Sequence, residues 1–142
     1  MTFGKRTGGV VIVVDTSVWI DAHRRPTSSI ARTLKGLLDA DEAALVLPVR
    51  LELAAGVSRR DRPALLRALS GLPLVRPSDD TWRVIEQWVP AAADKGHRFG
   101  LSDWLIAALT SEIGALVWSL DEDFAKLERL TFVRRYDASV LE

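Results

Sequence analysis

The feature that most constrains this sequence is a run of five β-branched residues, Val10 to Val14, that ends at the carboxylate of Asp15. The run shows no alternation of apolar and polar residues, which is typical of a strand covered on both faces in a parallel sheet. Parallel strands are joined by crossover connections, usually helices, so strands and helices should alternate along the chain. Asp15 then either caps the next helix, lies at the surface without a role, or forms part of a site.

Apolar periodicity and turn residues indicate such an alternation along the whole chain. We expect further strands at 43–48, 72–75, 115–119 and 130–133. We expect helices at 30–38, 48–56, 63–71, 82–89 and 101–114. Right-handed crossovers between these strands predict an α/β protein, a three-layer αβα sandwich around a central, mostly parallel sheet of about four to five strands.

Local signals predict where several of these helices begin and end. Ser28 or Ser29 should cap the helix at 30–38, and Ser102 should cap the last helix. Gly114 should end that last helix, because glycine readily adopts the left-handed conformation that closes a helix. Pro90 should kink or restart the helix that contains it.

Length and composition limit the class of protein. With 142 residues the chain suits one domain, which we expect at 10–142 after a flexible arm at 1–9. Basic and acidic residues number 19 each, so affinity for nucleic acid would require a local patch. The absence of cysteine excludes disulfides and cysteine-ligated metals and favours a cytoplasmic protein. No stretch approaches the roughly eighteen apolar residues of a membrane span, so no membrane is expected as a partner.

Acidic residues follow the predicted strands or lie in the first turns of the predicted helices. These acids are Asp15, Glu52, Asp103, Asp121 and Asp123. The carboxyl ends of parallel strands meet at one edge of a sheet, where the functional crevice of such folds lies, so the acids should converge there. Asp21 lies further along its helix and is expected to be a solvated residue.

Helix capping explains each of these acids individually, because aspartate is a preferred residue at helix starts. Capping does not require an acid at every strand–helix junction, so the set as a whole favours a shared site. Converging carboxylates raise one another's pKa unless a cation neutralises them, and Mg²⁺ prefers such oxygen ligands. The chain has no GxxxxGK phosphate loop, and neither His23 nor His97 has triad-like neighbours. Metal-assisted hydrolysis of a phosphodiester is the chemistry that remains.

Four stretches of the sequence carry a resemblance to a known family. They are "VVDTSVWID" at 13–21, "PVRLELAAG" at 48–56, "GLSDWLIAALT" at 100–110 and "WSLDEDF" at 118–124. In this order they resemble the PIN-domain ribonucleases, and specifically the VapC toxins of bacterial toxin–antitoxin pairs, over nearly the whole chain after Val10. The arm at 1–9 departs from the family, whose members often begin within a few residues of the first strand.

The resemblance implies a site, a cofactor and a reaction. The implied catalytic, metal-binding acids are Asp15, Glu52, Asp103 and Asp121, with Asp123 as an assisting metal ligand. The implied supporting hydroxyls, which hold carboxylates or metal-bound water, are those of Thr16, Ser17 and Ser119. The implied reaction is endonucleolytic cleavage of RNA with Mg²⁺ or Mn²⁺, in which metal-activated water attacks the phosphodiester and translation is inhibited.

The resemblance also implies partners. They are an RNA substrate, a VapB-type antitoxin that covers the site, a second copy of the chain in a homodimer, and DNA only indirectly through the antitoxin. RNA requires positive charge near the acids, and an ordinary role as solvated surface charge is equally compatible with each basic candidate. These candidates are Arg24, Arg25, His97 and Arg98. Trp19 and Trp104 could stack on bases, although packing in the core or between subunits is the expected role.

Other functions stay open on this evidence. A PIN-like RNA-processing nuclease without an antitoxin would carry the same residues. A non-catalytic RNA- or protein-binding module of the same fold would be expected to lack one of the acids, and none is missing. A phosphoacceptor signalling domain needs paired acids after the first strand and a lysine after a late strand, and the sequence has neither.

Overall fold

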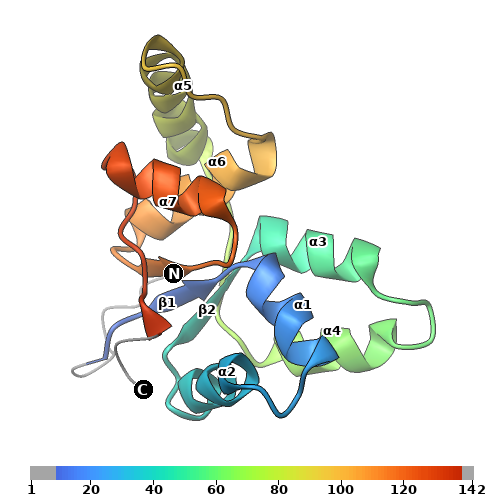
Figure 1. Cartoon of the computed structure of the whole chain (residues 1–142). Coiled ribbons are helices and arrows are strands. Elements are labelled where there is room, and N and C mark those ends of the chain that lie inside the picture. Colours follow the sequence, from blue (N-terminus) through green and yellow to red (C-terminus); the bar gives the residue numbers. More distant parts are fainter. Residues whose placement is uncertain (1–8, 139–142) are drawn as a thin grey trace.

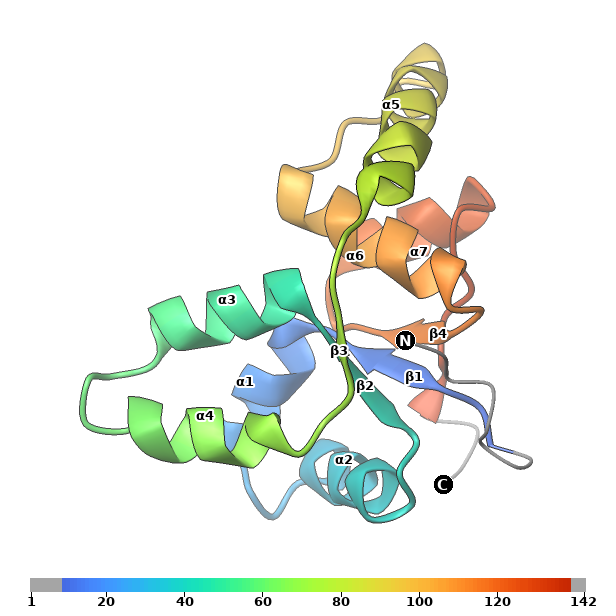
Figure 2. The ribbon, with the colours of Figure 1, turned by 180° about the vertical axis from the view of Figure 1, so that it is seen from behind.

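The structure is a computed structural model that describes residues 9–138 of the chain. The arm predicted at 1–9 therefore lies, except for Gly9, outside the described residues. Four strands of the described chain form a parallel sheet in the order β3-β2-β1-β4, with β3 at one edge (Figure 1, Figure 2). They are β1 (Ile12–Val14), β2 (Ala43–Val46), β3 (Leu74–Val75) and β4 (Leu116–Trp118).

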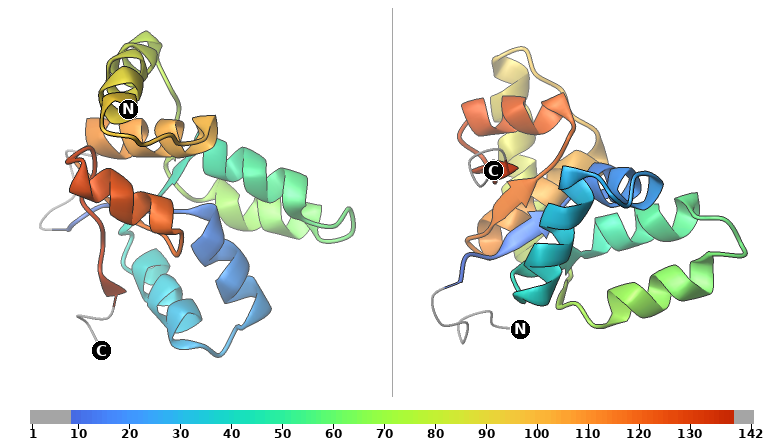
Figure 3. Two further views of the ribbon diagram at one scale, coloured as in Figure 1. Left: turned by 45° about the horizontal axis from the view of Figure 1, so that its top comes forward. Right: turned by 60° about the horizontal axis from the view of Figure 1, so that its bottom comes forward.

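Seven helices of the described chain surround this sheet. They are α1 (Thr16–Arg24), α2 (Ser29–Asp39), α3 (Leu47–Gly56), α4 (Arg62–Ser70), α5 (Asp79–Asp94), α6 (Leu101–Glu112) and α7 (Glu122–Arg129). Helices α1 and α2 lie on one side of the strands, and α5, α6 and α7 lie on the other (Figure 1, Figure 3). The predicted α/β sandwich is confirmed. Among residues 9–138, no helix combines the length and the hydropathy that a bilayer span needs.

The central strand β1 is buried on both faces, and none of its residues is more than 1% exposed. Val13 belongs to the apolar cluster that contains Ile106 of α6. Ile12 and Val14 belong to the other cluster, with Leu34 of α2. This two-sided burial is the physical reason why the run shows no apolar–polar alternation. It also places Asp15 at the end of a strand that packing holds rigidly.

Two of the predicted helix ends are confirmed. The Ser28 hydroxyl accepts a hydrogen bond from the backbone N–H of Ala31 at 3.1 Å and so caps α2. Gly114 follows α6 with a φ of 65°, the left-handed conformation in which a side chain would be strained. In addition, Pro48 lies in the first turn of α3, where its missing N–H costs no helical hydrogen bond.

One expectation about a helix end is wrong, and so is one of the two alternatives expected for Pro90. Ser102 does not cap α6, because the extended residue before the helix is Gly100 and Ser102 is already helical. The Ser102 hydroxyl oxygen is buried, with no hydrogen-bond partner in the described part of the chain. Pro90 does not restart its helix, since α5 runs on as one element to Asp94. Pro90 lies on the exposed side of α5, where water can satisfy the carbonyl that the missing N–H leaves free.

The strand predicted at 130–133 is also wrong. Thr131 has a φ of 68°, which is incompatible with an extended strand. The backbone N–H groups of this segment instead bond the last carbonyls of α7, as in the 3.1 Å bond from Phe132 to Leu127. An isolated parallel bridge between Val117 and Arg135 follows, so β4 is the last regular strand of the described chain.

Candidate metal site

Asp15 lies at the carboxyl end of β1 and is only 6% exposed. Its Oδ2 accepts two hydrogen bonds, from the Ser17 hydroxyl at 2.8 Å and from the Ser119 hydroxyl at 2.7 Å. Its backbone stands at the N-cap position of α1, but its side chain makes no capping hydrogen bond. The capping explanation therefore does not account for this carboxylate, which two hydroxyls from opposite ends of the chain orient instead.

The two serines are in turn held by the backbone after β4. The Ser17 hydroxyl accepts a hydrogen bond from the N–H of Leu120, and the Ser119 hydroxyl accepts one from the N–H of Asp121, each at 3.0 Å. Each hydroxyl thus accepts a hydrogen bond from a backbone N–H and donates one to Asp15. This chain of hydrogen bonds joins the start of α1 to the loop between β4 and α7.

Three further acids meet beside this loop. Asp103, in the first turn of α6, and Asp121 and Asp123, at the start of α7, each offer an oxygen within 4.8 Å of the others. The Asp121 carboxylate accepts a hydrogen bond from the N–H of Asp123 at 3.0 Å, so it caps α7 as well. Lys126 lies 3.8 Å from Asp123 and offsets part of the negative charge.

The Asp15 carboxylate interacts electrostatically with Asp103 of this group. Burial, followed by the hydrogen bond with Asp123, raises the pKa of Asp103 from 3.8 to about 7. The negative charges of Asp121, Asp123 and Asp15 contribute the rest of this rise in the pKa. The carboxylates of Asp15, Asp103, Asp121 and Asp123, here called the acidic cluster, therefore share one electrostatic environment.

Glu52 lies beside the acidic cluster rather than inside it. It is exposed on α3, and its Oε1 accepts a hydrogen bond from the Thr16 hydroxyl at 2.9 Å. The first turns of α1 and α3 lie side by side at the carboxyl ends of β1 and β2 (Figure 1). Thr16 thus fixes the position of Glu52. The Glu52 carboxylate is not among the oxygens of Asp103, Asp121 and Asp123 that lie close to one another.

The donor set of the acidic cluster suits a hard divalent cation. It offers only carboxylate oxygens, without imidazole, and this is the ligand type that Mg²⁺ and Mn²⁺ prefer. The raised pKa of Asp103 shows that the ion-free cluster holds its negative charge at an electrostatic cost, which a cation would remove. The residues present therefore fit a metal of this class.

The basic candidates fall into two groups. Arg24 and Arg25 lie at the far end of α1, and a helical rise of about 1.5 Å per residue places them roughly 12 Å from its start beside Asp15. Arg25 pairs with Asp21, whose side chain is only 13% exposed, so the expectation of a solvated Asp21 is wrong. His97 and Arg98 lie closer along the chain to Asp103, and the His97 ring stacks on Phe99 at 6.1 Å.

An aromatic cluster that the sequence reasoning missed supports the start of α6. Trp104, which follows Asp103, is only 4% exposed and lies 5.2 Å from Phe99 and 5.7 Å from Phe132 between ring centres. Trp88 of α5 stacks on Phe132 at 4.6 Å. The expected packing role of Trp104 is confirmed. The signal in the sequence was the helical spacing of Trp88 within α5, but Phe132 was assigned to a strand.

Comparison with known proteins assigns the family. The model of the PIN domain matches residues 12–130. Ribonuclease VapC18 of Mycobacterium tuberculosis is 30% identical over 127 residues, which cover 86% of this chain and 90% of that protein. The chain belongs to the VapC family of PIN-domain proteins. A second relative of this VapC-type PIN domain, ribonuclease VapC11 of the same species, is 29% identical over 126 residues, 85% of this chain and 94% of that protein.

Solved structures show that the αβα sandwich is the fold of VapC-type PIN domains. VapBC2 from Rickettsia felis, bound to a DNA fragment from its promoter, matches with a TM-score of 0.74 and 21% identity over 89% of this chain and 97% of that chain. DNA-bound VapBC from Salmonella typhimurium matches with a TM-score of 0.74 and 19% identity over 91% and 98% of the two chains. At these identities the structures establish the fold of this VapC-type domain, and the similarity extends over nearly its whole length.

Proposed function

We propose that this VapC-type PIN domain is a metal-dependent endoribonuclease and the toxin of a toxin–antitoxin pair. The observation that carries the proposal is the convergence of Asp15, Asp103, Asp121 and Asp123 from three separate parts of the chain. The curated relatives named ribonucleases support RNA as the substrate class. These four residues would hold Mg²⁺, with Mn²⁺ as the alternative, and Glu52 would approach the same ion from α3.

The residues of the chain have distinct roles in the proposed reaction. A bound divalent ion supplies Lewis-acid stabilisation of phosphoryl charge and lowers the pKa of water near the phosphodiester. Ser17 and Ser119 hold the Asp15 carboxylate in one orientation, and the N–H of Asp123 does the same for Asp121. In the proposed reaction water attacks the phosphorus and gives up one proton to solvent, the bond to the leaving ribose oxygen breaks, and that oxygen takes up a proton from solvent. Rigid placement of the acids would hold a bound ion at a fixed position relative to the phosphodiester.

Cleavage of RNA should require both the ion and Asp15. Purified protein should cut RNA in Mg²⁺, stop in EDTA and recover when Mg²⁺ is added in excess. Asp15→Asn keeps the size of the side chain but removes the negative charge that Oδ1 and Oδ2 share, so cleavage should fall by at least about 100-fold. Gel analysis of labelled RNA measures both effects. Full activity in EDTA or in Asp15→Asn would contradict the proposal.

The affinity for the divalent ion should depend on pH through Asp103. Its pKa of about 7 means that the ion must displace a proton below neutral pH. Affinity should therefore rise about tenfold per pH unit up to about pH 7 and level off above it. Calorimetric titration with Mn²⁺ at pH 5.5, 6.5 and 8 measures the trend. In Asp103→Asn the affinity should be lower at every pH and nearly independent of pH over this interval.

The partners are proposed from the relatives of known structure. The structures from Rickettsia felis and Salmonella typhimurium are VapBC assemblies with DNA, which supports a VapB-type antitoxin as the partner of this chain. We propose that the antitoxin covers the acidic cluster, that DNA is contacted only through the antitoxin, and that the chain forms a homodimer. Inhibition of translation through RNA cleavage, in the cytoplasm, completes the proposed role.

A further inference from the structure

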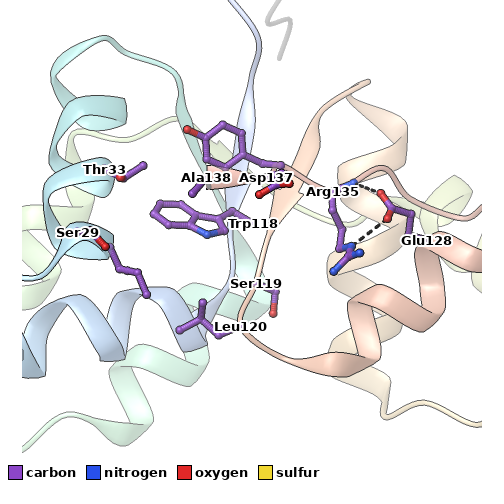
Figure 4. A pocket seen from close by; sticks show the side chains of 11 residues that line it. Ser29, Thr33, Trp118, Ser119, Leu120, Glu128, Arg135, Asp137 and Ala138 are labelled. Atoms are coloured by element: carbon purple, nitrogen blue, oxygen red, sulfur yellow. Dashed lines mark hydrogen bonds and ion pairs between the residues drawn. The ribbon is translucent and has the colours of Figure 1, made fainter. Parts of the chain in front are cut away.

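A cavity of about 620 Å³ opens at the carboxyl end of β4. Its walls come from the first turns of α2, from the end of β4 with the two residues that follow, and from residues 135–138 after α7. Figure 4 shows the Trp118 indole between Thr33 on the α2 side and Arg135 on the α7 side. We call this cavity the base pocket. None of the four acids of the acidic cluster lines it.

The walls of the base pocket combine aromatic, aliphatic and polar groups. The rings of Trp118 and Tyr136 meet edge to face with centres 5.5 Å apart. The Thr33 hydroxyl lies on the opposite wall. The Arg135 guanidinium is oriented by Glu128, which accepts bonds from its Nε at 3.0 Å and from its backbone N–H at 2.7 Å (Figure 4). Trp118 is only 4% exposed, so the half-buried Tyr136 ring and the oriented Arg135 donors are the groups that would contact a nucleobase.

The base pocket shares a wall with the acidic cluster. Ser119 lines the pocket, and its hydroxyl lies 2.7 Å from the Asp15 carboxylate. Leu120 lines the pocket too, and its N–H bonds the hydroxyl of Ser17, which is the second donor to Asp15. The pocket wall is therefore joined to Asp15 by the hydrogen bonds of two adjacent residues.

We propose that the base pocket receives one nucleobase of the RNA strand, from a nucleotide next to the phosphodiester that is cut, and so sets the sequence preference of cleavage. This inference rests on the proposed function and adds the sequence specificity of RNA cleavage. The volume lies within the range of about 300–1,000 Å³ that is typical of small-ligand sites, and it holds a base with room for its sugar. Thr33 can discriminate between bases through one hydrogen bond to the edge of the base.

The test fills the pocket from α2. Thr33→Trp places an indole in the pocket, whereas Lys35→Trp adds the same side chain at an exposed position of the same helix, where Lys35 is 76% exposed. Each variant and the wild type cut a pool of RNA with random sequence in Mg²⁺, and the ends of the products are sequenced. The wild type should prefer particular bases at one position beside the cut. Thr33→Trp should reduce that preference about tenfold or more, and Lys35→Trp should leave it unchanged.

A second variant keeps the inference testable if the indole prevents folding. Thr33→Val retains the shape of the side chain and removes its hydroxyl, so it should change the base preference by roughly two- to tenfold. Circular dichroism verifies that each variant is folded. An unchanged preference in folded Thr33→Trp, or in Thr33→Val where the indole does not fold, overturns the base pocket. An equal loss of base preference in Lys35→Trp overturns the base pocket as well.

The same experiment separates the base pocket from the proposed function. Absence of RNA cleavage by the wild type in both Mg²⁺ and Mn²⁺ overturns the nuclease and the pocket together. Metal-dependent cleavage with an unaltered pattern in folded Thr33→Trp leaves the nuclease standing and removes the pocket alone. If Thr33→Trp weakens inhibition by the antitoxin while the cleavage pattern stays the same, the cavity binds a protein segment and the inference about RNA is wrong.

Discussion

Replacing Asp103 with Asn should abolish RNA cleavage and, at the same time, raise the thermal stability of the metal-free protein at pH 8. Activity is lost because one ligand of the acidic cluster becomes neutral, and we expect a fall of about 100-fold or more. Stability rises because the carboxylate is charged at pH 8 although burial and three neighbouring acids oppose that charge. Cleavage assays in Mg²⁺ and thermal unfolding in EDTA measure the two effects on one variant.

The sign of the stability effect follows from the raised pKa. Between about pH 4 and pH 7 the unfolded Asp103 is ionised while the folded one keeps its proton, so the folded state binds more protons and loses stability as the pH rises. Above pH 7 the full loss is present, and Asp103→Asn removes it. At pH 5 the folded carboxyl is still protonated, so the gain in stability of the variant should be smaller.

A matched control is available on α5. Asp94 is an exposed acid at the end of that helix, and Asp94→Asn should change neither cleavage nor the unfolding temperature in EDTA. Retained cleavage in Asp103→Asn would remove Asp103 from the proposed site. A lower unfolding temperature of Asp103→Asn at pH 8 would show that its carboxylate stabilises the metal-free fold, contrary to the electrostatics described above.

Trp104→Ala should lower the free energy of unfolding by about 3–5 kcal/mol, the range for truncating a large buried aromatic side chain. Trp104 is only 4% exposed and lies within 6.5 Å of Trp88, Phe99 and Phe132 between ring centres. Its loss leaves a cavity directly after Asp103, so the affinity for the divalent ion should fall as well. Urea unfolding and calorimetric titration measure the two quantities.

Trp82 provides the comparison for this variant. It is also a helical tryptophan but is 42% exposed on α5, so Trp82→Ala should cost less than about 1 kcal/mol. Trp104→Phe should retain most of the stability, because a smaller ring still fills part of the space. Equal losses in the two alanine variants would show that the aromatic cluster does not stabilise the start of α6.

The features that the sequence predicted correctly are those that depend on the burial of apolar side chains. The unbroken β-branched run of β1 predicted a strand covered on both faces, and that geometry alone placed Asp15 at the functional edge. The first-turn position of Asp103 and the position of Asp121 shortly after β4 then brought these acids to the same edge. What sequence reasoning could not reach are contacts made between distant segments by short polar side chains, such as the bond from Thr16 to Glu52.

The wrong predictions have a common physical cause. Local propensity predicted a strand for the apolar residues around Phe132. The stacking of the Phe132 ring on Trp88 and the left-handed conformation of Thr131 override that propensity. Asp21 was expected in water because aspartate usually is, whereas Arg25 one turn later makes a largely buried position tolerable. In the first case a partner distant in sequence decides the outcome, and in the second a partner one helical turn away does.

Because Ser17 and Ser119 both donate hydrogen bonds to Asp15, the site is complete only after the ribosome has synthesised the chain as far as Ser119. The two hydroxyls are separated by 102 residues in sequence, and they meet only when β4 has paired with β1. A chain that ends before Ser119 carries Asp15 and Asp103 but neither Asp121 nor Asp123. Incomplete polypeptides released from the ribosome therefore lack the assembled acids. A cell that makes such a protein is exposed to the complete set only after nearly all of the chain has been translated.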